Sequence, residues 1–146
     1  MSKSDIRIRA KKRALHLLER MDRTEHQLRE KLMISIYQSQ LLKKSLYETV
    51  EDNFETVSDI EDYGKNLIKS VANEKERFIE YINAVLEDWT FDRLGYLEQS
   101  ILLLACAEFD CKEISAQVIM DEAINLTKSY CDDNTYKLIN GVLDRL

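Results

Sequence analysis

Basic side chains gather at the start of this chain, and anion binding is the chemistry that they indicate. The first 23 residues hold eight Lys or Arg and three Asp or Glu, a net charge of +5. Residues 24–146 hold 13 basic and 24 acidic residues, a net charge of −11. A basic segment on an acidic body favours an anionic partner at the N-terminal end, such as the phosphates of a nucleic acid. A solvated amphipathic helix without a ligand fits the same pattern equally well.

The sequence contains no arrangement of residues that is typical of a catalytic site or of a metal site. The residues considered are Cys106, Cys111, Cys131, His16 and His26. The cysteines form no C-x-x-C pair and the histidines lie far from them, so we expect reduced thiols and no zinc site. Asp121 and Glu122 point about 100° apart on a helix and do not form an acid–base pair. Because the chain also lacks a glycine-rich phosphate loop and a Ser/His or Cys/His constellation, we expect no enzyme and no cofactor.

The elements that must position any site are helices. Proline is absent and there are three glycines, so little interrupts the many helix-favouring residues. Apolar residues recur at helical spacing and predict an all-α fold. We expect helices over residues 5–21, 24–44, 46–53, 60–89 with a break at 72–76, 97–109, 115–130 and 133–146. The segment 97–109 is apolar on nearly every side, which is typical of a central, buried helix.

Several residues predict how these helices begin and pack. Two capping boxes are expected, at 24–27 and at 58–61, and Ser115 is expected to cap the helix that follows it. Asp133 or Asn134 is expected to cap the last helix. Within that helix Gly141 should allow a neighbouring helix to approach closely, because glycine in a helix interior otherwise costs about 1 kcal/mol.

The chain is expected to be soluble and cytoplasmic, with no membrane contact. Its longest apolar run, 101–107, is far shorter than the roughly 20 residues that a membrane-spanning helix needs. The charged N-terminus is not followed by the apolar stretch of a signal peptide. We divide the chain into a basic N-terminal helical extension, residues 1–23, and one helical domain, residues 24–146.

Three segments, taken together, resemble the NusB family of transcription antitermination factors. They are Leu28–Gln38 with its Ile36-Tyr37 pair, Trp89–Leu102 with its Trp89 and Arg93, and Asp121–Asp144 with its Leu138-Ile139-Asn140-Gly141-Val142-Leu143-Asp144 run. The resemblance extends from about Thr24 to Leu146. It implies a compact NusB-like bundle of about seven helices, to which residues 1–23 add an extra basic helix.

The resemblance also implies a function in binding. Members of the family pair with NusE, a small-subunit ribosomal protein, and the pair binds the boxA element of nascent ribosomal RNA transcripts. The complex then helps RNA polymerase to read through terminators. We therefore expect boxA-type single-stranded RNA, NusE and the RNA polymerase antitermination complex as partners, and we leave open whether the chain forms a homodimer.

The candidate RNA-binding residues follow from the same resemblance. They are Arg23, Arg29, Asn134, Tyr136 and Lys137. In the family an Arg-rich run near the start and the polar turn before the last helix contact RNA, but residues 25–27 here lack the usual arginines. The +5 extension is one way to replace them. Tyr136 would stack on a base and Asn134 would bind a base edge. The simpler alternatives are a core or rim tyrosine and a helix-capping asparagine.

A second resemblance leads to a different function. Residues 13–32 are similar to a helical repeat of the RecX family, which regulates RecA, except that Gln27 replaces a glutamate. The similarity ends at Leu32, and the remaining chain does not supply the further repeats. The alternative function is therefore a helical protein-interaction regulator that modulates RecA without binding RNA.

Overall fold

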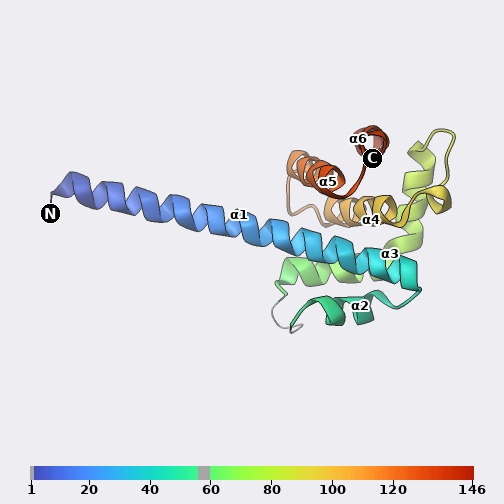
Figure 1. Cartoon of the computed structure of the whole chain (residues 1–146), viewed down its shortest axis with the longest axis horizontal. Helices are drawn as coiled ribbons and strands as arrows, with labels where there is room; N and C mark the ends of the chain where they lie inside the picture. Colours follow the sequence, from blue (N-terminus) through green and yellow to red (C-terminus); the bar gives the residue numbers. More distant parts are fainter. Residues whose placement is uncertain (1, 56–59) are drawn as a thin grey trace.

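The structure, a computed structural model, describes the backbone of residues 2–55 and 60–146 and the side chains of 2–9, 26–55 and 60–146. Its elements are α1 (Lys3–Leu42), α2 (Leu46–Asn53), α3 (Asp62–Val85), the short 3-10 helix η2 (Phe91–Arg93), α4 (Tyr96–Cys111), α5 (Ala116–Tyr130) and α6 (Asp133–Arg145) (Figure 1). No strand occurs in the described residues. The expected all-helical fold is therefore confirmed.

Helix α4 is the centre of the bundle. It packs against α1, α3 and α5 (Figure 1). All residues from Gln99 to Glu108 are buried, so this helix is enclosed on every side. The prediction of a central, buried helix at 97–109 is confirmed.

Among the described residues, no helix combines the length and the apolar character that crossing a membrane requires.

Helix α1 is one helix of 40 residues where the sequence predicted two. Residues 22–25 continue the helix, so the capping box expected at 24–27 is wrong. The cap lies at Ser2 instead, whose hydroxyl accepts from the amide of Asp5 at 3.2 Å. The chain carries no proline or glycine here, and nothing in the local sequence stops a helix once it has begun. The N-terminal part of α1 projects well beyond the other helices (Figure 1).

Helix α3 also runs unbroken, through residues 72–76, so the break expected there is wrong. These residues lie towards the outside of the helix, where Glu and Lys favour helix without needing apolar contacts. The capping box expected at 58–61 falls partly outside the described residues, and α3 has Glu61 as its N-cap. The predicted bounds of α2 are confirmed, as is the cap of α5, where Ser115 accepts from the amide of Val118 at 3.4 Å.

The two helical glycines differ in their surroundings. A Cβ at Gly64 would lie 2.8 Å from Cγ2 of Ile60 and 3.2 Å from Cδ1 of Leu28, so α3 needs glycine where α1 passes. A Cβ at Gly141 would meet only Nη2 of Arg145, at 3.8 Å. The expectation that Gly141 permits a close helix approach is therefore wrong, and that role belongs to Gly64.

Replacing Gly141 with alanine should raise the free energy of unfolding by about 0.5–1 kcal/mol. Alanine favours the helix more than glycine does, and its methyl group would meet no close neighbour. Urea denaturation followed by circular dichroism measures the change. Gly64→Ala is the matched control, and it should destabilise the protein because its methyl group meets Ile60. Destabilisation by Gly141→Ala would contradict the prediction.

Candidate nucleic-acid interface

A hollow of about 340 Å³ lies where the first turns of α4 and α6 meet the connection from α3 to η2. Its lining consists of Trp89, Arg93, Leu94, Gly95, Glu98, Asp132, Asn134, Thr135 and Leu138. We call it the tryptophan hollow. Trp89 is 52 % exposed, which is unusual for so large an apolar side chain. The hollow thus combines an exposed indole, a guanidinium and a side-chain amide.

The segment that carries Trp89 and Arg93 is held in place by buried side chains and hydrogen bonds. Phe91 and Leu94 are buried and anchor it in the core. The Gln99 amide, itself buried, donates to the carbonyls of Phe91 and Leu94 at 3.0 and 3.1 Å. The side-chain oxygen of Asn83 accepts from the amide of Phe91 at 2.7 Å. These bonds hold a short irregular segment in one shape, so its exposed side chains are presented from a rigid base.

The acidic groups of the tryptophan hollow are occupied by donors of the protein itself. Asp132 is the N-cap of α6 and accepts from the amide of Thr135 at 2.9 Å. The backbone amide of Thr135 holds the pKa of Asp132 below its usual range. The Thr135 hydroxyl donates to Glu98 at 3.3 Å. The cap was expected at Asp133 or Asn134. Because Asp132 takes that position, the amide of Asn134 is free of this role.

The other two residues predicted in this turn lie beside the hollow rather than in its lining. Lys137 is exposed and follows Asn134 by three residues, so the two share a face of α6. Tyr136 is half-buried, and the ammonium of Lys128 lies 5.4 Å from the centre of its ring. The structure therefore places Asn134 and Lys137 on an accessible surface and leaves Tyr136 half-buried against Lys128.

Of the two predicted arginines, Arg29 is not part of this surface. The side chain of Arg23 lies outside the described residues. Arg29 is 3 % exposed, and its Nε donates to Glu108 at 2.9 Å. The Tyr63 hydroxyl donates to the same carboxylate oxygen at 2.7 Å. The guanidinium of Arg29 is enclosed in the bundle, a position that does not suit contact with an RNA phosphate.

Burial and the shared carboxylate set the ionisation of this group. Burial alone would lower the pKa of Arg29, but the Glu108 carboxylate outweighs it, so the pKa is raised and the guanidinium stays charged. Burial and the same carboxylate raise the pKa of Tyr63 well above its usual range. The Nη2 atom of Arg29 is buried without a hydrogen-bond partner among the described atoms. The pair links α1 to α4, and Tyr63 adds α3 to it.

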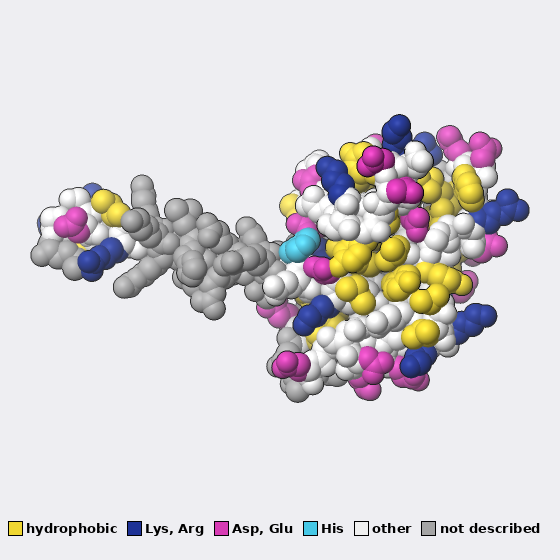
Figure 2. Space-filling model, viewed as in Figure 1, with side chains coloured by type: hydrophobic (Ala, Val, Ile, Leu, Met, Phe, Trp, Pro, Cys, Tyr) yellow, Lys and Arg dark blue, Asp and Glu magenta, His cyan; other side chains and the backbone are white. Residues whose placement is uncertain are grey.

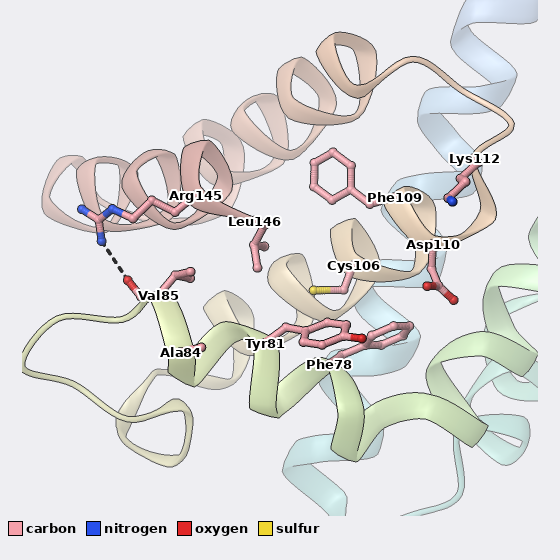
Figure 3. Close-up of a pocket in the computed structure, with 10 residues that line it drawn as sticks. All are labelled: Phe78, Tyr81, Ala84, Val85, Cys106, Phe109, Asp110, Lys112, Arg145 and Leu146. Atoms are coloured by element: carbon pink, nitrogen blue, oxygen red, sulfur yellow. Dashed lines mark hydrogen bonds between the residues drawn. The ribbon is translucent and has the colours of Figure 1, made fainter.

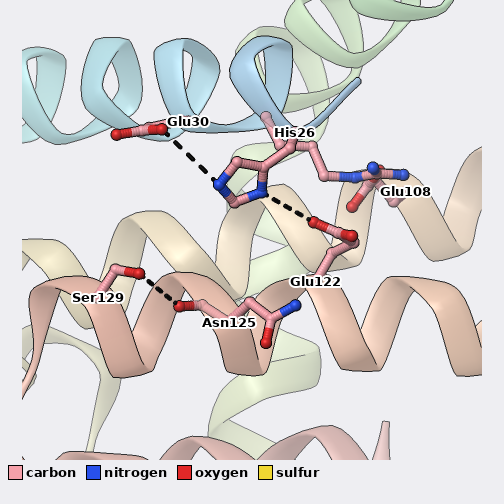
Figure 4. Close-up of polar contacts among 7 residues, drawn as sticks. His26, Glu30, Glu108, Glu122, Asn125 and Ser129 are labelled. Atoms are coloured by element: carbon pink, nitrogen blue, oxygen red, sulfur yellow. Dashed lines mark hydrogen bonds and ion pairs between the residues drawn. The ribbon is translucent and has the colours of Figure 1, made fainter. Parts of the chain in front are cut away.

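A second polar group lies where α1 leaves the body (Figure 4). Nδ1 of His26 is 3.2 Å from a Glu122 oxygen on α5, and Nε2 is 3.8 Å from Glu30. Glu30 also accepts from the hydroxyl of Tyr130 at the end of α5. Through its contact with His26, Glu122 has the character of a structural polar residue. These contacts tie α1 to α5.

The thiols are free and have the environment of inert side chains. Burial raises the pKa of Cys106 to about 12 and that of Cys131 to about 11. Burial also raises the pKa of Cys111. A thiol rather than a thiolate is therefore present at neutral pH, and the thiolate is the reactive form. In the part of the chain that the structure describes, no three His, Cys, Asp or Glu residues come together as metal ligands.

The described residues form a small, all-helical protein with a rigidly supported polar and aromatic surface. A model of the NusB family matches residues 8–146. The chain belongs to the NusB family, which is a family of transcription antitermination factors rather than of enzymes.

Individual relatives agree with the family match. The chain is 38 % identical over 87 residues to the transcription antitermination protein NusB of Crocosphaera subtropica, covering 60 % of this chain and 42 % of that protein. It is 28 % identical over 122 residues to NusB of Anaeromyxobacter dehalogenans, covering 81 % and 86 %. The matched segment therefore spans about two fifths of the cyanobacterial relative.

A solved structure of the antitermination factors NusB and NusE in complex with double-stranded RNA has the same fold. The TM-score is 0.73 at 26 % identity, over 84 % of this chain and 94 % of that one.

Trp89 and Arg93 are the residues that the sequence did not assign to the site. Both belong to one of the three segments that resemble the family, but an isolated tryptophan is more often buried than exposed. Phe91 and Leu94 are buried and anchor the segment. Trp89 lies two residues before Phe91, and Arg93 lies one residue before Leu94. This alternation of apolar anchors with other residues is the pattern that could have identified the exposed positions. The pattern can be interpreted only when it is known that this segment is largely irregular rather than α-helical.

Proposed function

We propose that this chain is a transcription antitermination factor that binds boxA-type RNA of nascent ribosomal RNA transcripts together with NusE. Membership of the NusB family supports the proposal. A similar structure contains NusB with NusE and RNA, and that structure covers most of this chain. The observation that carries the RNA-binding part is the tryptophan hollow, where Trp89, Arg93 and Asn134 are presented side by side.

Each side chain of the hollow has a role suited to single-stranded RNA. The exposed indole of Trp89 stacks on an unpaired base, since a base offers a flat aromatic face whatever its identity. The guanidinium of Arg93 binds a phosphate. The Asn134 amide, with both a donor and an acceptor, bonds to a base edge. Lys137, on the same face of α6 as Asn134, adds a second phosphate contact.

The wider assembly follows from the family. In this proposal the RNA–protein complex joins the RNA polymerase antitermination complex, and the protein acts in the cytoplasm. The RecX-like alternative has no comparable support. Residues 13–32 form one uninterrupted helix and lack the turn that a helix–turn–helix repeat requires.

Replacing Trp89 with alanine should weaken binding of boxA-type RNA by about 1–3 kcal/mol, because one stacked base loses its partner. Arg93→Gln should weaken binding and lower the slope of log K against log salt by about one, since one phosphate contact is lost. Fluorescence anisotropy at two or more salt concentrations, with and without NusE, measures both effects.

Two controls match these variants in chemistry and exposure but lie away from the tryptophan hollow. Tyr47→Ala removes a 48 % exposed aromatic ring from α2, and Lys69→Gln removes an exposed cation from α3. Neither should change RNA affinity by more than about twofold. If the Trp89 and Arg93 variants bind RNA as the unchanged protein does, the RNA site is elsewhere. If the unchanged protein binds neither boxA-type RNA nor NusE, the proposed function is wrong.

A further inference from the structure

The projecting part of α1 has no role in the function proposed above. We call residues 3–25 the arm. At 1.5 Å per residue the arm is about 35 Å long, enough to cross another domain of this size. Its N-terminus lies far from the remaining helices (Figure 1). In proteins most of the stability of a helix comes from packing of an apolar face, so a projecting helix of this kind is usually stabilised by packing against a partner.

The sequence of the arm indicates a partner with an apolar surface. Ile6 is 55 % exposed at the tip. The apolar residues that follow it at helical spacing are Ala10, Ala14, Leu17 and Met21, and the same period leads on to Leu28 and Leu32 in the bundle. Leu32 is buried and Leu28 packs against the core. The arm therefore repeats the pattern of the segment of α1 that faces the bundle.

Charge limits what that partner is. The arm holds eight Lys or Arg and four Asp or Glu, a net charge of +4, and the rest of the chain carries −10. Two arms laid against each other would repel, whereas an arm and the body of another copy attract. Figure 2 shows acidic side chains at several places on the visible face of the body, among basic ones, and the described tip of the arm shows apolar, basic and acidic side chains. The body of this same protein is thus an electrostatically suited partner.

The body has an apolar hollow with no assigned function. It measures about 400 Å³, lies between α3, α4 and the end of α6, and is lined by Phe78, Tyr81, Ala84, Val85, Cys106, Phe109, Asp110, Lys112, Arg145 and Leu146 (Figure 3). We call it the α3–α4 hollow. The aromatic rings of Phe78, Tyr81 and Phe109 surround it, and its volume suits one or two aliphatic side chains.

Of the three charged residues that line this hollow, Asp110 and Arg145 are paired within the protein and Lys112 is exposed. Arg77 binds Asp110 through two nitrogens, at 2.9 and 3.2 Å. Arg145 donates to the carbonyl of Val85 at 2.8 Å and lies 3.6 Å from Glu87. At Asp110 and Arg145 an apolar side chain therefore enters without removing water from an unpaired charge, and Lys112 can keep its ammonium in solvent.

We propose that the arm of one copy docks on the body of a second copy, with Ile6 in the α3–α4 hollow. The first turns of α1 project away from their own body, so the contact is between copies (Figure 1). Exchange of two arms gives a closed, two-fold dimer in which each copy supplies one arm and one hollow. The proposal is independent of the RNA function, because it uses a different hollow and is measured without RNA.

Sedimentation equilibrium of the full chain over a range of concentrations tests the proposal. We expect a dimer whose dissociation constant rises by about tenfold or more with Ile6→Asp in the arm and with Ala84→Glu in the hollow. Ala84 is exposed, so the substitution should leave folding intact. Higher salt should also weaken the dimer, since opposite charges steer the arm to the body.

Matched controls separate the proposed contact from general effects of charge. Ile8 is 52 % exposed at the same tip but lies about 200° around the helix from Ile6, so Ile8→Asp should leave the dimer unchanged. Ala72→Glu places the same charge on an exposed position of α3 outside the hollow, and it should also leave the dissociation constant of the dimer unchanged. Equal effects of Ile6→Asp and Ile8→Asp would overturn the proposal.

Two further outcomes count against it. A chain that stays monomeric up to about 100 μM has no such contact of useful strength. The other occupant to distinguish is RNA, whose phosphates would use the cations of the arm but not Ile6. If Arg7→Gln and Arg9→Gln weaken RNA binding while Ile6→Asp changes neither RNA binding nor association, the arm is an RNA contact and the proposed docking is wrong.

Discussion

Replacing Glu108 with alanine should lower the free energy of unfolding by about 3–5 kcal/mol, among the largest effects of any single change in this protein. Glu108 and Arg29 are 2 % and 3 % exposed, and Nε of Arg29 is 2.9 Å from the carboxylate. Without Glu108 the guanidinium stays enclosed with no counter-charge, and the Tyr63 hydroxyl loses its acceptor. Urea denaturation monitored by circular dichroism measures the loss.

The double variant Arg29→Met with Glu108→Leu is the control for this prediction. It removes both charges and replaces them with apolar side chains of similar length, so it should be far less destabilising than Glu108→Ala alone. Tyr63→Phe should cost less than either, because one hydrogen bond is lost and no charge is left unpaired. A Glu108→Ala protein as stable as the unchanged one would show that the pair contributes nothing.

Replacing Leu104 with alanine should lower the free energy of unfolding by about 2–5 kcal/mol, through lost burial and the cavity left behind. Leu104 is 2 % exposed on α4, the helix that α1, α3 and α5 enclose. The surrounding helices cannot close the gap without separating from one another. Thermal unfolding followed by circular dichroism, together with urea titration, measures the effect.

Leu41→Ala makes the same chemical change at a 45 % exposed position of α1 and is the matched control. It should change stability by less than about 0.5 kcal/mol. Equal losses at the two positions would mean that α4 is not the centre of the core.

These two stability predictions concern the helical scaffold. The RNA and arm variants change exposed side chains instead, so that folding and binding are measured separately.

The sequence-based predictions that the structure confirms are those in which helix propensity, apolar pattern and capping residues agree. Segment 97–109 is apolar all round, and the structure buries it as α4. Ser115 caps α5 where a hydroxyl precedes an amphipathic run, and α2 has the bounds that its short pattern predicted. In each case neighbouring residues decide the outcome, so no knowledge of distant contacts is needed.

The incorrect predictions concern interruptions and glycine. The polar stretch at 72–76 and the threonine at 24 predict interruptions, but a helix without proline or glycine continues through polar residues. Gly141 was expected to lie at a close approach, and the close approach is at Gly64. Which glycine touches another helix depends on where the helices cross, and periodicity within one helix does not contain that information.

The candidate site divides in the same way. Asn134 and Lys137 were selected from the turn before the last helix, and they lie on an accessible surface. Arg29 was selected as a basic residue in the first helix, and the structure encloses it with Glu108, 79 positions further along the chain. An arginine on the buried face of a helix and one on the outer face have the same local sequence, so the difference appears only when the facing helix is known.

The sequence by itself determined that this protein is all-helical, that residues 97–109 form its centre and that its family is NusB, because helical periodicity and ordered motifs are properties of neighbouring residues. Tertiary structure alone decided that Trp89, Arg93 and Asn134 meet at one hollow and that Arg29 belongs to the core. These facts depend on the packing of helices that are distant in sequence. A helix fixes which residues share its face, but only its neighbours decide whether that face is inside or outside.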